Sequence, residues 1–204
     1  MPSRQHWFDG WRLFALLSLT LLGLSIWIAS MRGFEVDGVR MVIRFTARTS
    51  LVLFCLAFSA AALARLWPNA WTRWLRRNRR YLGVSFAASH AIHLVAIVAF
   101  AVMDPAGYAA ATSIGSYIFG GIGYAFILAM TLTSFDRTTA AIGANAWRRL
   151  HLVGGYYLLF QFMVSFGMRI SDMRLYALFL IPLVAVFALR MIAMAPRAQA
   201  ARTG

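Results

Sequence analysis

The fold is decided by residues 81–103, YLGVSFAASHAIHLVAIVAFAVM. This stretch contains no charged residue. At about 1.5 Å of rise per residue a helix of this length spans about 35 Å, which is enough to cross the roughly 30 Å hydrocarbon core of a bilayer. The stretch therefore predicts a membrane-spanning helix that carries two imidazoles, those of His90 and His93.

Five further stretches of similar length and apolar character flank this segment. They cover about residues 11–31, 49–67, 114–133, 147–168 and 175–195. We therefore expect an all-α fold, a polytopic membrane bundle of six transmembrane helices. The bundle forms a single domain over 1–204, with its core at about 11–195, and the segment DPAGYAAATS (104–113) is expected to be a loop.

Composition and charge agree with this class and exclude others. The chain is 61% hydrophobic and 13% charged, whereas soluble domains are about 25% charged. Its formal net charge is +14, and its arginines cluster between the apolar stretches. Because such clusters mark the cytoplasmic side, both termini are expected to be cytoplasmic. We expect the chain to contact membrane lipids and not to bind nucleic acid. The loops are too short for a nucleotide- or flavin-binding domain.

The candidate site residues are histidines. His6 lies in the N-terminal tail, whereas His90, His93 and His151 fall in the third and fifth spans. An intramembrane imidazole is a functional candidate by default, and its alternative role is packing through a hydrogen bond to a neighbouring helix. The third and fifth spans run in the same direction, so one histidine from each can hold a b-type heme between them. Gly154, three residues after His151, would leave room for the macrocycle.

The expected depths of the histidines in the bilayer do not decide whether His90 or His93 is the ligand on the third span. His93 lies about 18 Å beyond Tyr81, and His151 only about 6 Å beyond Trp147. His90, about 14 Å in, matches the depth of His151 better. Zinc, di-iron and proton-coupled transport sites are disfavoured, because the predicted spans contain no carboxylate.

Three stretches resemble a known family. FTARTSLVLFCLAFSAAALAR (45–65), RRYLGVSFAASHAIH (79–93) and WRRLHLVGGYYLLF (147–160) are similar to the ferric reductase-like transmembrane domain. The closest branch is the MsrQ/YedZ-type heme-binding membrane subunit of the periplasmic methionine sulfoxide reductase system. The resemblance covers about residues 11–195. It implies a six-helix bundle with heme ligands at His93 and His151, whereas His90 has no counterpart.

The resemblance also implies a function. Electrons would pass across the inner membrane of a bacterium, from a quinone or a cytoplasmic flavoprotein to a periplasmic reductase. The chain would be an electron-transfer subunit rather than a self-contained enzyme. Two-heme members carry a second histidine 13 or 14 residues further along both helices. Here Val164 or Ser165 follows His151 at that spacing, so one bis-histidine heme b is expected, with FMN or quinone as a further cofactor.

Arginines at the span ends are candidate partners for anionic groups. Arg48, at the outer end of the second span, is a candidate for pairing with heme propionates, as a guanidinium pairs with carboxylates. Its alternative role is lipid headgroup contact and a topology signal. The competing functions for the whole chain are a cofactor-free membrane scaffold and a small transporter.

Overall fold

The computed structural model describes residues 8–171 and 173–195, and these residues form helices and no strand. The elements are α1 (Gly10–Ser30), α2 (Val36–Leu66), α3 (Ala70–Met103), α4 (Pro105–Ala111), α5 (Ile114–Leu132), α6 (Asp136–Gly167), the 3₁₀ turns Met168–Ile170 and Arg174–Tyr176, and α7 (Ala177–Met194). Six of them are long and apolar enough to cross a membrane. The predicted all-α bundle of six spans is confirmed, and the chain is a multi-pass membrane protein.

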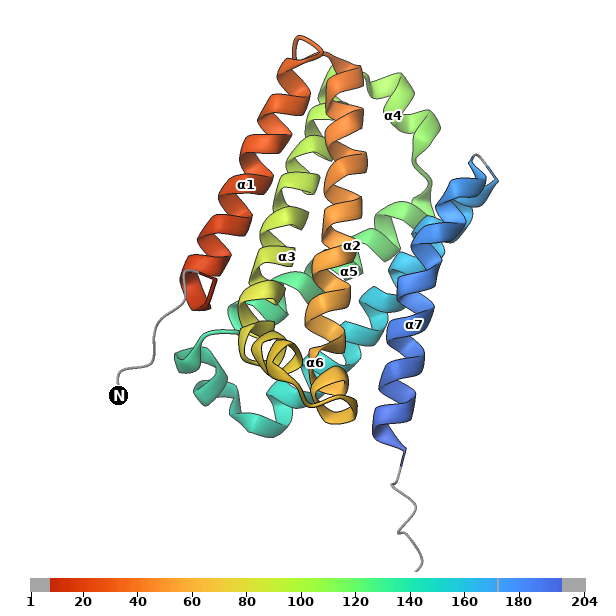
Figure 1. Cartoon of the computed structure of the whole chain (residues 1–204). Coiled ribbons are helices and arrows are strands. Elements are labelled where there is room, and N and C mark those ends of the chain that lie inside the picture. Colours follow the sequence, from red (N-terminus) through yellow and green to blue (C-terminus); the bar gives the residue numbers. More distant parts are fainter. Residues whose placement is uncertain (1–7, 172, 196–204) are drawn as a thin grey trace, which may run out of the picture.

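The centre of the fold is the antiparallel pair α2 and α3, which are joined by a very short turn (Figure 1). Pro68 follows the last residues of α2, and a proline disfavours helical conformation in the residue before it. Asn69 then caps α3: its side chain accepts from the Thr72 amide at 3.0 Å, and the Thr72 hydroxyl accepts from the Asn69 amide at 3.0 Å. This reciprocal capping box fixes where α3 begins.

Hydroxyl groups line the α2–α3 interface. The Ser50 hydroxyl donates to that of Ser89 at 2.9 Å, and Thr49 lies 3.2 Å from the same oxygen. Ser85 lies one turn away on the same face of α3 and is fully buried, but its hydroxyl has no hydrogen-bond partner among the described residues. Small hydroxyl side chains let two membrane helices approach closely and hydrogen-bond across the interface.

The other helices pack around this pair. α1 lies against α3 and α2, α7 lies against α2, and α5 pairs with α6 (Figure 1). The start of α1 is fixed by Asn78 of α3, which accepts from the Gly10 amide at 2.9 Å and donates to the Asp9 carboxylate at 2.6 Å. α3 and α6 meet mainly through aromatic side chains rather than through close backbone approach.

Three helices extend further than the sequence predicted. The spans predicted to begin at 49, 81 and 147 belong to helices that begin earlier, at Val36 (α2), Ala70 (α3) and Asp136 (α6). The added turns of α2 and α3 are rich in arginine, which has high helix propensity and ends a bilayer span without ending a helix. Those of α6 contain one arginine, Arg137. α4 lies inside the expected loop at 104–113, where Asp104 caps it by accepting from the Gly107 amide at 2.9 Å.

One break interrupts α6. Gly143 has φ +77° and ψ 156°, a conformation that favours glycine because it has no Cβ. The break separates the first two turns of α6 from the part that crosses the bundle. His151, Gly154 and Gly155 all lie beyond it.

The outer surface of the bundle is apolar. Exposed large hydrophobic side chains occur on every spanning helix, among them Leu19, Val52, Val95, Leu128, Phe160 and Ile181. An apolar surface of this extent is expected only where lipid covers it, so the spans contact membrane lipid.

Candidate functional site

Two of the candidate histidines lie next to each other on α3. The rings of His90 and His93 are 5.5 Å apart between centroids. They are three residues apart and so project about 60° from each other around the helix. His93 turns towards α2, and His90 turns towards α5 and α6. The two rings are therefore separate candidates rather than the two axial ligands of one iron.

His93 is oriented by Thr46 of α2, whose hydroxyl oxygen lies 2.9 Å from Nδ1. The same hydroxyl donates to the Val42 carbonyl at 2.7 Å. A hydroxyl has one proton to donate and two lone pairs to accept with. We therefore place the ring proton of His93 on Nδ1, from which it is donated to the Thr46 hydroxyl. The other ring nitrogen, Nε2, then carries a free lone pair. An imidazole held in this way through one nitrogen and free at the other is the usual form of a metal ligand.

His90 occupies an aromatic environment. Its ring lies 4.8 Å from that of Phe86, 5.6 Å from that of Tyr124 and 5.9 Å from that of Phe162. Its Nδ1 atom is buried and has no hydrogen-bond partner among the described residues. Burying a polar atom without a partner is costly, so this nitrogen is available to accept or donate a hydrogen bond to a ligand or a water molecule.

A groove of about 460 Å³ opens beside His90, between α1, α3 and α5. Its walls are almost entirely apolar, and they include Phe14, Ala87, Ala91, Ile127 and Leu128. Tyr124 also lines the groove, and its hydroxyl donates to the His90 carbonyl at 3.3 Å. The groove suits a ligand with an apolar body and few polar groups.

His151 belongs to a different cluster, at the turn between α5 and α6. Its Nε2 atom lies 3.3 Å from the hydroxyl of Thr133, and its ring stacks on that of Trp147 at 4.4 Å. The Thr133 hydroxyl donates to the Ala129 carbonyl at 2.8 Å. By the argument used for His93, His151 is assigned its proton on Nε2. An iron bound to His151 through Nε2 would have to replace the contact with Thr133.

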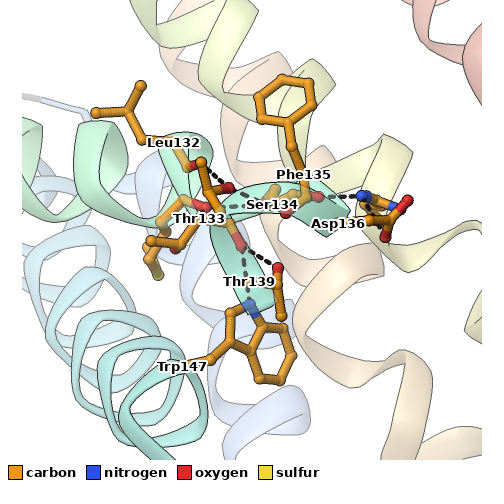
Figure 2. Close-up of polar contacts among 10 residues, drawn as sticks. Leu132, Thr133, Ser134, Phe135, Asp136, Thr139 and Trp147 are labelled. Carbon is orange, nitrogen blue, oxygen red and sulfur yellow. Dashed lines mark hydrogen bonds and ion pairs between the residues drawn. The ribbon is translucent and has the colours of Figure 1, made fainter. Parts of the chain in front are cut away.

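The turn beside His151 is held by several hydrogen bonds (Figure 2). The Thr133 carbonyl accepts from the Trp147 indole at 3.1 Å and from the Thr139 hydroxyl at 2.7 Å. Arg80 of α3 donates to the Ser134 carbonyl and forms an ion pair of 2.9 Å with Asp136. These contacts fix His151 close to the end of the bundle where α3 begins.

Two observations give the depth of His151 relative to the α3 histidines. His90 contacts Phe162, which lies about three helical turns after His151 on α6. Gly155, one turn after His151, approaches Phe58, which lies about three turns further along α2 than Thr46, the partner of His93. At about 1.5 Å of rise per residue, both place His93 and His151 roughly 20 Å apart along the bundle axis. The structure does not bring these two rings together.

The glycines beside His151 accommodate protein side chains. A Cβ atom on Gly155 would lie 2.6 Å from the ring of Phe58, and one on Gly154 would lie 2.9 Å from the sulfur of Met130. Rings of α2, α3 and α6 fill the space between α3 and α6: Phe54 lies 5.1 Å from Phe58, 5.7 Å from Phe86 and 5.3 Å from Phe162. In this packing the room predicted for a macrocycle beside Gly154 is occupied.

Arg48 is turned towards α7. Its guanidinium lies 5.7 Å from the ring of Tyr176 and 5.5 Å from that of Phe179, and it approaches the Tyr176 hydroxyl at 3.5 Å. Arg48 is two residues after Thr46 and so faces the opposite side of α2. It lies near the depth of His93 but on another face of the helix.

For a heme iron, the residues fit on the side of α3. The free Nε2 of His93 and the unpartnered Nδ1 of His90 are suitable nitrogen donors in an apolar bundle. The residues on the side of α6 do not fit in the same way. His151 lies at another depth, and protein side chains fill the space beside Gly154 and Gly155.

The hydrogen-bond partners of the histidines were not apparent from the sequence. The number of residues from Thr46 to the α2–α3 turn is about the same as the number from the turn to His93. The same is true of Ser50 and Ser89. Residues equidistant from a short turn lie level in an antiparallel pair. That symmetry could have identified Thr46, had the length of the turn been known.

Comparison of the chain with family models, with curated proteins and with solved structures finds no match.

Gly155→Ala is expected to destabilise the bundle, because the added methyl group would displace the ring of Phe58 from its position against Phe54. Overpacking of this kind costs about 1–3 kcal/mol. The measurement is the thermal unfolding midpoint in detergent. Gly121→Ala is the matched control, because nothing lies within 4 Å of its Cβ position, and it should be neutral or stabilising. Equal midpoints for the two variants would contradict the packing described here.

Thr46→Val is expected to change the tautomer of His93, because it removes the oxygen that accepts from Nδ1 while keeping the shape of the side chain. The measurement is the ¹⁵N chemical shift of both imidazole nitrogens in protein with labelled histidine. The wild type should show a protonated Nδ1 at His93, and Thr46→Ser should preserve it. Thr131→Val is the control, because that hydroxyl donates to Ile127 of its own helix. A wild-type His93 protonated on Nε2 would refute the assignment.

Proposed function

We propose that this chain is a heme-binding electron-transfer protein of the bacterial inner membrane, with both termini cytoplasmic. The observation that supports the proposal best is the arrangement of His93. The Thr46 hydroxyl holds the Nδ1 atom of His93, and the Nε2 atom of His93 makes no hydrogen bond to another described residue. Imidazole nitrogens of this kind, on a helix inside a membrane bundle, are typical ligands of b-type heme.

The bound group would supply a one-electron redox centre. The residues of this chain would do the rest: His93 would bind the iron, Thr46 would fix the orientation of His93, and the surrounding apolar side chains would exclude water. Burial and nearby charge tune the reduction potential of such a centre. Arg169 lies within electrostatic reach of His93, and we propose it as a cation that favours the reduced state. Arg48, which faces another side of α2, stays a prediction as a partner of the heme propionates.

His151 stays a prediction as the second ligand. It is the candidate that the family resemblance indicates, and α6 carries no other histidine within its described residues. Ligation of the same iron by both histidines requires α6 to pack at a different depth from the one described. Variants at the three membrane histidines therefore test both the cofactor and the arrangement of α6.

We propose a membrane quinol as the electron donor, and a reductase on the opposite side of the membrane as the acceptor. The groove beside His90 supports the first part. It is apolar, it lies on the lipid-facing side of α3 and α5, and it has His90 and Tyr124 in its wall. A quinol bound in this groove would leave as the quinone only after two successive one-electron transfers to the heme, which would pass the first electron to the acceptor before taking the second, and its two protons would be released to water. A cytoplasmic flavoprotein is the alternative donor, and the reductase partner rests on the family resemblance.

A cofactor-free scaffold is the second candidate function. The observation that favours it is the aromatic cluster between α3 and α6, together with the contacts of His151 to Thr133 and Trp147. These contacts give His151 a packing role without any ligand. The scaffold and the electron-transfer protein differ in one simple measurement, the visible absorption spectrum.

Protein expressed with ample heme and purified in detergent is expected to show a Soret band that shifts on reduction. His93→Ala should abolish it, because the variant removes the proposed ligand nitrogen. His6→Ala is the control and should keep the band; His6 lies outside the described residues. Absence of the band from the wild type would refute the heme proposal and favour the scaffold.

The remaining histidine variants locate the other ligand. Loss of the band in His151→Ala as well as in His93→Ala would establish that the two residues share an iron, and so that α6 packs differently in the heme-bound protein. Retention in His151→Ala with loss in His93→Ala would show that the second ligand is another group. Retention in His93→Ala with loss in His90→Ala would move the α3 ligand to His90.

Ala91→Phe is expected to slow reduction of the oxidised protein by a short-chain quinol, because the added ring would fill the groove. The measurement is the initial rate of the spectral change in stopped flow, where a tenfold decrease corresponds to about 1.4 kcal/mol in the barrier. Val95→Phe is the control, since Val95 is exposed on the same helix and does not line the groove. Equal rates in both variants would place the quinol elsewhere.

A further inference from the structure

A second cavity lies at the end of the bundle where α2 and α7 end. It has a volume of about 160 Å³. Alanines form much of its wall, and two arginines face it, Arg65 from the last turn of α2 and Arg190 from α7. Neither arginine forms an ion pair with a carboxylate among the described residues.

Arg190 is held rigidly. Its Nη1 atom donates to the Phe58 carbonyl at 3.0 Å, and its Nε atom donates to the Tyr156 hydroxyl at 3.3 Å. The guanidinium also lies 4.0 Å above the ring of Phe58. These contacts use two of its three nitrogens, and Nη2 makes no hydrogen bond to another residue that the structure describes. A fixed guanidinium with a free edge is well suited to bind an anion.

The surroundings add positive charge. Arg79 of α3 lies within electrostatic reach of both Arg76 and Arg190. The ion pair of Arg80 with Asp136 is the only salt bridge in the described part of the chain, so this end has a surplus of cations. Because a partly buried charge without a counter-ion is costly, an external anion would stabilise the arrangement.

We propose that the cavity between Arg65 and Arg190 binds the phosphate group of an anionic phospholipid. A phosphate accepts several hydrogen bonds from guanidinium groups at once. Alanines around the two arginines leave room for the headgroup, and the apolar outer faces of α2 and α7 are suited to the acyl chains. Basic pockets between membrane helices at the cytoplasmic side are a known mode of lipid headgroup recognition. This site is separate from the histidines, and its test does not depend on heme.

The decisive variant is Arg65→Gln, because Arg65 makes no hydrogen bond or ion pair to another described residue and its loss should leave the fold intact. The measurement is binding of phosphatidylglycerol to delipidated protein, followed by native mass spectrometry and by the rise in the unfolding midpoint. Phosphatidylcholine and inorganic phosphate are titrated in parallel. We expect phosphatidylglycerol to bind the wild type, with an affinity at least about tenfold lower in Arg65→Gln.

Arg149→Gln is the matched control, because Arg149 is an exposed arginine of α6 and its loss changes the net charge equally. It should bind phosphatidylglycerol as the wild type does. Equal weakening in Arg65→Gln and Arg149→Gln would overturn the site and leave only general attraction to an anionic surface. Stabilisation by inorganic phosphate without stabilisation by phosphatidylglycerol would overturn the assignment to a lipid.

Arg190→Lys provides an independent check. Lysine keeps the charge but offers a single ammonium group in place of the planar fork. We expect weaker binding of phosphatidylglycerol and a smaller loss than in Arg190→Gln. An affinity in Arg190→Lys equal to that of the wild type would show that Arg190 does not bind the phosphate through its guanidinium.

Discussion

The arrangement of this bundle depends on the short turn between α2 and α3. Pro68 ends one helix and the Asn69–Thr72 capping box begins the next, so the two helices run antiparallel from a fixed origin. The depth of every residue on α2 is then coupled to the depth of one residue on α3. The hydroxyl contacts Ser50–Ser89 and Thr46–His93 follow from that coupling, and α1 and α7 pack against the pair it creates.

The three candidate histidines lie in three different environments. His93 lies beside a hydroxyl that orients it, and His90 beside aromatic rings and an apolar groove. His151 lies near the other end of the bundle, against Thr133 and Trp147. A cofactor that binds on α3 is compatible with these contacts as they stand. A cofactor shared with α6 is compatible only with a different packing of the aromatic cluster.

The sequence was sufficient for the fold class, since apolar runs of about 20 residues have few structural alternatives. It did not show that α2 and α3 continue through arginine-rich turns, because charge marks the edge of the bilayer and not the end of a helix, and it did not show that α6 begins as early as Asp136. It placed His90, His93 and His151 inside spans. It could not give their contacts, which depend on how far each helix slides and rotates against its neighbours. Gly154 and Gly155 illustrate this: small side chains indicated space, and the fold uses that space for Met130 and Phe58.

The α2–α3 turn also limits how the length of this chain can vary. A residue inserted into α2 after Thr46, or into α3 before His93, would advance one helix by about 1.5 Å and rotate it by about 100° relative to the other. Thr46 would then no longer face His93, and Ser50 would no longer face Ser89. Insertions in the segment that connects α3 to α5 carry no such cost, because α4 is short and none of its residues is buried. Natural variants of this protein should therefore differ in length at α4 and keep the spacing from Thr46 to His93 constant.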